Sequence, residues 1–278
     1  MIKFALVVIT FLLVTSLWGF YISVRPPKII STITPKELGL AYEQVVFKTV
    51  DDVSLSGWFI PSKKTNAKTI VLLHGYPADK GDILPALAFL NDAYNLFLFD
   101  FRHLGQSKGR YSTAGAKEIA DLRAAIEHLK TRGINEMGVW GFSMGGAVAL
   151  MTAPQSPEIK AIVSESSYAR LDLMARELYR LPFLDYPLAE LTRFWARLFL
   201  GVDIKESSPM DAVKKLQIPV LVVHSINDET IPFGHALLLQ DALKNNPQAE
   251  FWFSENLTHG QLGGAYQKRI MGFFSKNI

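Results

Sequence analysis

The residues Gly141-Phe142-Ser143-Met144-Gly145 place a serine hydroxyl between two glycines. An apolar run, MGVWG, precedes the serine, and a run of small residues, GAVALMTA, follows it. This pattern is typical of a strand that turns sharply into a helix and exposes a nucleophile at the turn. We therefore predict that Ser143 is a nucleophile. A tight turn that only needs small residues would share the motif. The prediction of a nucleophile therefore depends on whether the chain also supplies a base and an acid as partners of the serine.

A serine hydroxyl needs a general base, and the base needs an acid that orients it. His259 follows the last strand-like run of the chain, and we predict that it is the base. Asp228 follows the strand-like run IPVLVV and is the predicted acid. Its neighbour Glu229 is an alternative. Glu165, at the end of the run after the nucleophile, is another.

Acyl transfer also requires two backbone N–H groups that face the developing oxyanion. We predict that Met144, directly after the nucleophile, supplies one of them. The loop after TIVLLHG supplies the other, and Tyr76 is the expected donor because His74-Gly75 bends the chain before it.

Short apolar runs alternate with segments of helical periodicity. The runs are TIVLLHG (69–75), NLFLFDF (95–101), MGVWGFS (137–143), KAIVSES (160–166), IPVLVVHS (218–225) and AEFWFSE (249–255). QVVFKTV and LSGWFIP flank a polar turn and predict an antiparallel pair. Helices are predicted over 83–92, 114–132, 145–153 and 233–245. The alternation predicts an α/β fold, with a mostly parallel central sheet and helices on both faces.

One long segment interrupts this alternation. Residues 168–216 contain helix-like pieces, three prolines and many large apolar side chains, and lie between two strand-like runs. We predict a helical cap over the carboxyl edge of the sheet. Residues 26–43 are predicted to be a linker, and 44–278 the folded domain.

A stretch of 21 uncharged residues (4–24) lies near the N-terminus. A helix of this length spans about 30 Å, the thickness of the hydrocarbon core of a bilayer. Trp18 and Tyr21 lie near one end, where aromatic residues favour the interface. We predict an uncleaved transmembrane anchor over 1–25 that takes no part in the fold. A cleaved signal peptide is the alternative, and the flanking charges leave the side of the membrane open.

The composition excludes several function classes. Hydrophobic residues make up 49% and charged residues 20% of the chain, as in a globular protein. The net charge of +3 comes from interspersed acids and bases, so no nucleic-acid partner is expected. Without cysteine, disulfides, thiolate metal sites and a cysteine nucleophile are excluded.

From about residue 44 to its end, the chain resembles the α/β-hydrolase superfamily, in particular its membrane-anchored, serine-aminopeptidase-like branch. The resemblance rests on VLLHGY (71–76), DFRHLGQSKG (100–109), GFSMGG (141–146), SP (208–209), IPVLVVHSINDETIP (218–232) and THG (258–260), in this order. It implies triad roles for Ser143, Asp228 and His259, and oxyanion-hole roles for Tyr76 and Met144.

Two positions depart from the pattern of that family. His103 stands where glycine is usual, and His224-Ser225 stands where the family has His-Gly before the acid. Neither position belongs to the expected triad, but both affect loops near it.

The predicted function is that of a membrane-anchored serine hydrolase that cleaves a carboxylic ester, thioester or amide through an acyl-enzyme. The apolar segment 168–216 indicates a hydrophobic small-molecule or acyl substrate. No metal or organic cofactor is implied. Two alternatives stay open: a hydrolase-fold binding or scaffold protein without chemistry, and an acyltransferase or aminopeptidase that uses the same triad.

Overall fold

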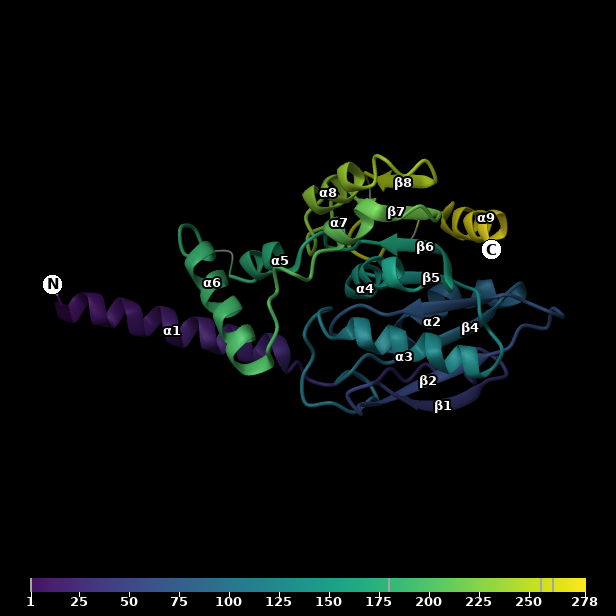
Figure 1. The fold of residues 1–278 in the computed structure, drawn as a ribbon, viewed down its shortest axis with the longest axis horizontal. Helices are drawn as coiled ribbons and strands as arrows, with labels where there is room; N and C mark the ends of the chain where they lie inside the picture. Colours follow the sequence, from purple (N-terminus) through teal and green to yellow (C-terminus); the bar gives the residue numbers. More distant parts are fainter. Residues whose placement is uncertain (1, 180, 256, 262) are drawn as a thin grey trace.

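The computed structural model describes residues 2–179, 181–255, 257–261 and 263–278. An eight-stranded sheet with the order β1-β2-β4-β3-β5-β6-β7-β8 forms its centre (Figure 1). The strands are β1 (Glu43–Lys48), β2 (Ser54–Ile60), β3 (Thr69–Leu73), β4 (Asn95–Phe99), β5 (Met137–Phe142), β6 (Ile159–Glu165), β7 (Val220–Ser225) and β8 (Ala249–Ser254). β2 pairs antiparallel with β1 and β4, and the other neighbours pair in parallel. The predicted α/β fold and its antiparallel first pair are confirmed.

Helices cover both faces of this sheet. Helices on one face are α3 (Glu118–Thr131), α4 (Met144–Thr152) and α8 (Gly234–Ala242), and their apolar side chains pack against alternate strand residues such as Val71 and Leu73. α2 (Lys80–Leu87), η1 (Ala88–Asp92) and α9 (Tyr266–Asn277) pack on Ile70 and Leu72 at the opposite face. The central strands are therefore buried on both sides, which explains their unbroken apolar runs.

The chain between β6 and β7 is helical, as the sequence indicated. It contains α5 (Leu171–Glu177), α6 (Asp185–Trp195) and the π-helical turn η3 (Ala196–Leu200), here called the cap helices. The short α7 (Pro209–Ala212) and η4 (Val213–Lys215) then return the chain to the sheet, while η2 (Ala153–Gln155) extends α4. The cap helices lie beyond the sheet, beside the N-terminal helix (Figure 1).

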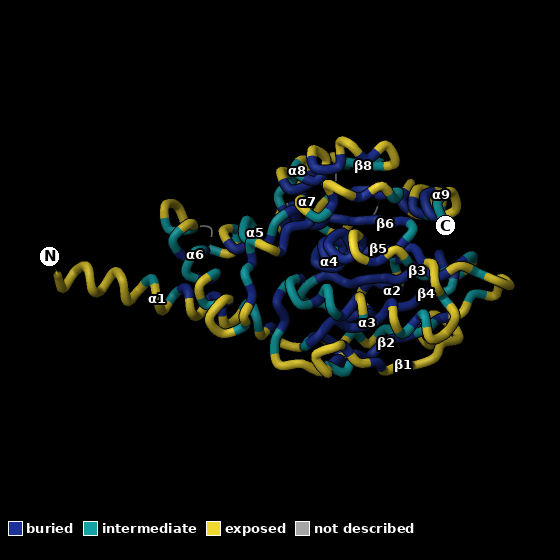
Figure 2. Tube along the Cα trace, in the orientation of Figure 1, coloured by how far each residue is buried: buried dark blue, intermediate teal, exposed yellow. Residues whose placement is uncertain are grey.

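The N-terminal helix α1 (Ile2–Val24) takes part in the fold, contrary to expectation. Its outer half projects away from the body, and its inner half lies against α6 (Figures 1 and 2). Ser16, Gly19 and Phe20 are buried there. The Trp195 indole donates to the Ser16 hydroxyl at 3.0 Å. The expectation that α1 takes no part in the fold was wrong, because three buried positions hardly change the hydropathy of a helix that is apolar throughout.

The irregular segment 25–42 fastens α1 to the domain. The ammonium group of Lys28 donates to the Ser107 carbonyl at 2.6 Å. The backbone N–H of Ser31 donates to the Asp79 carboxylate at 2.8 Å. The carbonyl of Val24, the last residue of α1, accepts from the N–H of Ser112 at 2.9 Å. These bonds fix where the inner end of α1 meets the body.

Candidate active site

Ser143 lies at the sharp turn between β5 and α4. Its backbone adopts φ 54° and ψ −117°, a left-handed conformation that costs a non-glycine residue about 1–3 kcal/mol. The flanking glycines make the turn possible: a Cβ on Gly141 would lie 2.5 Å from the carbonyl oxygen of Gly145. A Cβ on Gly145 would lie 2.5 Å from the Leu73 carbonyl oxygen. The fold thus holds the serine in a strained turn that matches a nucleophile elbow.

The loops after β7 and β8 bring Asp228 and His259 together. The Nδ1–H of His259 donates to Oδ2 of Asp228 at 2.7 Å, and the Asp228 carboxylate is fully buried. Burial opposes ionisation of Asp228, but hydrogen bonds from His259 and from the backbone N–H groups of Ile231 and Thr230 outweigh it. The pKa of Asp228 therefore lies below its ordinary value, and the aspartate stays ionised beside the histidine.

The two alternative acids lie in different surroundings. Glu229 is exposed, whereas the neighbouring Asp228 points into the loop toward His259. Glu165 is buried at the end of β6 and accepts a hydrogen bond from the Tyr266 hydroxyl. Burial raises the pKa of Glu165 to about 7, although the hydrogen bond with Tyr266 favours its ionised form. The contact with His259 therefore singles out Asp228 among the three acids.

His259 lies against Phe142, the residue before the predicted nucleophile. The ring centroids of Phe142 and His259 are 4.7 Å apart, and Phe142 directly precedes the serine. Within the described ranges, no hydrogen bond engages Ser143 Oγ. Catalytic hydrogen bonds are often long in free enzymes and tighten when substrate binds, so this arrangement is compatible with a serine–histidine pair.

The loop after β3 carries Tyr76 next to the serine turn. A Cβ on Gly75 would lie 3.2 Å from the Ser143 Cβ, so this loop touches the nucleophile. His74 bends the loop: Nε2 accepts from the Phe101 N–H at 3.0 Å, which leaves Nδ1–H to donate to the Gly75 carbonyl at 2.7 Å. Burial lowers the pKa of His74 and keeps the ring neutral, as this pattern requires.

The two expected oxyanion donors lie on the loop after β3 and at the start of α4. Met144 begins α4, so its backbone N–H lies at the helix N-terminus, where orphan N–H groups favour negative charge. As far as the structure describes the chain, no protein acceptor occupies the backbone N–H of Tyr76 or Met144. Both N–H groups can therefore donate a hydrogen bond to a ligand oxygen.

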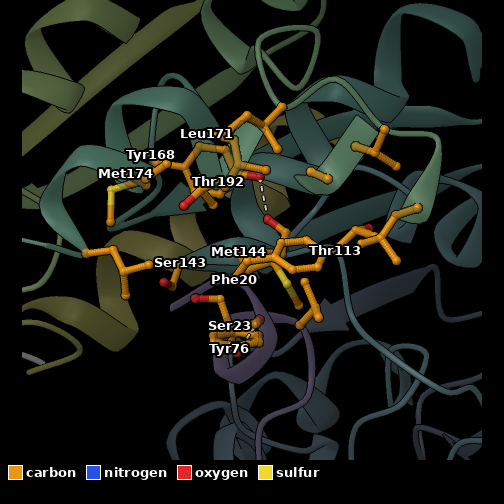
Figure 3. Close-up of a pocket in the computed structure, with 18 of the residues that line it drawn as sticks. Phe20, Ser23, Tyr76, Thr113, Ser143, Met144, Tyr168, Leu171, Met174 and Thr192 are labelled. Carbon is orange, nitrogen blue, oxygen red and sulfur yellow. Dashed lines mark hydrogen bonds between the residues drawn. The ribbon is translucent and has the colours of Figure 1, made fainter. Parts of the chain in front are cut away.

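A cavity of about 230 Å³ lies beside Ser143. Figure 3 shows Ser143 and Met144 at this cavity, with Tyr76 and Ser23 on one side and Tyr168 and Met174 on the other. Its lining is mostly apolar and comes from three parts of the molecule: the sheet edge, the cap helices and the end of α1, which contributes Phe20, Ser23 and Val24. Sequence reasoning missed the α1 residues. The small residues within the apolar run of α1 were the available sign that this helix packs closely against another part of the molecule.

Both departures from the family pattern have local structural reasons. His103 adopts φ 68°, a left-handed conformation that explains why glycine is usual there. His224 donates through Nε2 to the Ile231 carbonyl at 2.9 Å, which holds the loop that carries Asp228. The Ser225 hydroxyl donates to the Leu257 carbonyl in the His259 loop. His224 and Ser225 thus connect the two loops at the site.

Comparison with known proteins identifies the family. The model of the prolyl oligopeptidase family matches residues 106–277, more than half of the chain. The chain belongs to the prolyl oligopeptidase family of α/β-hydrolases. The resemblance expected from the sequence is thereby confirmed.

Relatives of this α/β-hydrolase support the same assignment. Protein bem46 of Schizosaccharomyces pombe is 27% identical over 255 residues, which cover 88% of this chain and 80% of bem46. The α/β-hydrolase domain-containing protein WAV2 of Arabidopsis thaliana is 29% identical and covers 79% of this chain and 72% of its own. Among solved structures, the Pyrococcus furiosus esterase Pf2001 superimposes with a TM-score of 0.74 at 27% identity, over 92% of this chain and 98% of the esterase.

Proposed function

We propose that this α/β-hydrolase is a membrane-anchored serine hydrolase that uses Ser143, His259 and Asp228 as a catalytic triad. One observation carries the proposal. The strained serine turn and the hydrogen-bonded Asp228–His259 pair lie at the same carboxyl edge of the sheet, where the serine borders an apolar cavity. In this proposal residues 1–25 form the anchor, 26–43 the linker and 44–278 the hydrolase domain, with the cap at about 168–216.

The acylation step follows from these positions. Nε2 of His259 takes the proton of the Ser143 hydroxyl as its oxygen attacks the substrate carbonyl carbon. The carbonyl oxygen becomes an oxyanion, and the backbone N–H groups of Tyr76 and Met144 donate hydrogen bonds to it. The anionic Asp228 stabilises the imidazolium. Collapse of the tetrahedral intermediate breaks the bond to the leaving group, which takes the proton from His259.

Deacylation repeats the sequence with water. His259 removes a proton from water as its oxygen attacks the acyl-serine, and the second intermediate releases the acid and restores the Ser143 hydroxyl. Overall, one ester, thioester or amide and one water give a carboxylic acid and an alcohol, thiol or amine. The apolar cavity favours a hydrophobic acyl group, and the similarity to esterase Pf2001 supports an ester.

The decisive test is labelling with a fluorophosphonate probe, which reacts with an activated serine. We expect wild type to be labelled and Ser143→Ala to be unlabelled. An unlabelled wild type would overturn the proposal and favour the scaffold alternative. A panel of p-nitrophenyl esters, acyl-coenzyme A and aminoacyl anilides then separates ester, thioester and amide cleavage. Rates highest on aminoacyl anilides would assign a peptidase instead.

A further inference from the structure

The inner end of α1 forms part of the cavity wall beside the nucleophile. Phe20, Ser23 and Val24 line the same cavity as Ser143. The Tyr76 hydroxyl donates to the Ser23 carbonyl at 2.7 Å, so the loop that carries an expected oxyanion donor is bonded directly to α1 (Figure 3). A helix that only tethered the domain would not need to reach the reacting centre.

The contact between α1 and the cap is close and specific. A Cβ on Gly19 would lie 2.7 Å from the Tyr179 hydroxyl oxygen, so a larger residue at this position would displace the Tyr179 ring. Ser16, Gly19 and Ser23 follow one face of the helix, a spacing of small residues typical of helix packing within membranes. The Phe20 ring stacks on Phe199 of η3 with centroids 6.1 Å apart. The cap and α1 therefore enclose the cavity together.

The length of α1 places this contact at the membrane surface. Every described residue from Ile2 to Thr15 is exposed or half-buried, and these 14 residues span about 21 Å. The hydrocarbon core of a bilayer is about 30 Å thick. If α1 crosses it, the helix turns that touch the cap must also lie in the membrane, and about 5–10 Å of the cap must enter with them, the usual depth of interfacial helices.

The surface of the cap fits this position. Several of its large apolar side chains are exposed; they include Leu178, Phe183, Phe194, Leu198 and Phe199, with Phe183 95% exposed. Charged cap residues pair with each other, as Arg193 does with Asp203 at 2.7 Å and Arg176 with Asp185 at 3.0 Å. Paired charges among exposed apolar residues suit the headgroup region rather than water or hydrocarbon alone.

We propose that the substrate is an acyl ester of a membrane lipid, whose chain enters the cavity directly from the bilayer between α1 and the cap helices. This inference rests on the proposed serine hydrolase function. A benzene-sized ligand fills an apolar cavity of about 150 Å³. The cavity here, at about 230 Å³, takes a longer apolar group, and α1 and the cap helices both contribute to its lining.

The route is tested with full-length protein in phosphatidylcholine vesicles. The probe is 4-methylumbelliferyl palmitate, placed either in the same vesicles as the protein or in separate vesicles. We expect hydrolysis to be at least tenfold faster in the same vesicles. The water-soluble acetate ester, added to both samples, should be cleaved equally. Equal palmitate rates in the two arrangements would overturn entry from the bilayer.

The contribution of α1 to the cavity wall is tested by substitutions within this helix. Val24→Trp narrows the cavity and should lower the ratio of palmitate to acetate kcat/KM at least tenfold, as expected when a pocket loses room for part of a chain. Phe20→Ala widens it and should shift preference toward bulkier acyl groups. Val14→Trp is the matched control, because Val14 is 61% exposed on the outer half of α1, and it should keep the wild-type ratio.

The outcomes separate the two proposals. Fluorophosphonate labelling of each variant shows that its Ser143 site is formed. If Val24→Trp is not labelled, Phe20→Ala becomes the variant that tests the α1 wall. A labelled variant with the wild-type palmitate-to-acetate ratio overturns the α1 wall and leaves the serine hydrolase intact. An unlabelled wild type overturns the hydrolase function itself.

Discussion

At the residue scale, the proposed chemistry depends on one contact that distinguishes three acids. Asp228 is buried, ionised and hydrogen-bonded to His259, whereas Glu165 is bonded to Tyr266. A buried carboxylate of lowered pKa stabilises the imidazolium that forms when the serine loses its proton. A carboxyl group of raised pKa, such as that of Glu165 at about 7, is only partly ionised at neutral pH.

Asp228→Asn should reduce kcat by about 10³–10⁴-fold, because an amide cannot hold the imidazole in its reactive tautomer or stabilise its positive charge. Ester hydrolysis under single-turnover conditions measures the loss. Glu165→Gln is the matched control and should keep kcat within a few-fold of wild type. The reverse ranking of the two variants would reassign the triad acid.

The raised pKa of Glu165 predicts how stability depends on pH. Because its folded pKa of about 7 exceeds its ordinary value of 4.5, the unfolded chain releases this proton first as the pH rises. The free energy of unfolding therefore falls between these two values, by an amount on the order of 2–3 kcal/mol. Glu165→Gln should raise the thermal unfolding midpoint at pH 8 and leave it unchanged at pH 5. An equal effect at both pH values would contradict this account.

At the element scale, the strand–serine–helix turn depends on glycines that tolerate no side chain. Gly145→Ala places a methyl group against the Leu73 carbonyl and should lower the free energy of unfolding by about 1–3 kcal/mol. The substitution should also weaken fluorophosphonate labelling, because the distorted turn would move Ser143 from its position. Gly272→Ala is the control: open space surrounds this helical position in α9, and alanine should stabilise it by about 0.5–1 kcal/mol. Denaturant titration of both variants makes the comparison.

Local sequence patterns predicted the helices and strands better than the contacts between them. The glycines around Ser143 and the order of Asp228 and His259 indicated the candidate site, because strand ends in a parallel sheet meet at one edge. Helix α9 was not predicted, although Tyr266, Ile270 and Phe273 show helical spacing. The packing of Gly19 on Tyr179 joins residues far apart in sequence, and no periodicity within either segment encodes such a contact.

At the scale of the whole molecule, the buried contacts of α1 argue for retention of the N-terminal segment. The helix is long and apolar enough to cross a membrane, but a signal sequence satisfies the same criterion. Cleavage near Ser16 would remove a residue that accepts a hydrogen bond from Trp195 and would open the cavity.

The mature protein should therefore retain residues 1–25 and remain in the membrane pellet after an alkaline carbonate wash. Intact-mass spectrometry of the protein purified from membranes, with immunoblotting of pellet and supernatant, checks both points. A mass that lacks the first 15 to 25 residues, together with recovery in the supernatant, would establish a signal peptide.

The packed face of α1 also has a consequence for the evolution of this chain. A plain tether needs only hydrophobicity, so mutations that exchange one apolar residue for another should accumulate freely on its outward positions, such as Phe4, Val7 and Phe11. Ser16, Gly19 and Ser23 carry a second constraint. A larger side chain at Ser16 or Gly19 would separate the helix from Tyr179 and Trp195, and Ser23 lines the cavity and bonds Tyr76. Orthologues should therefore keep small residues at these three positions while the rest of the helix drifts, and substitutions there should be matched by changes in the cap.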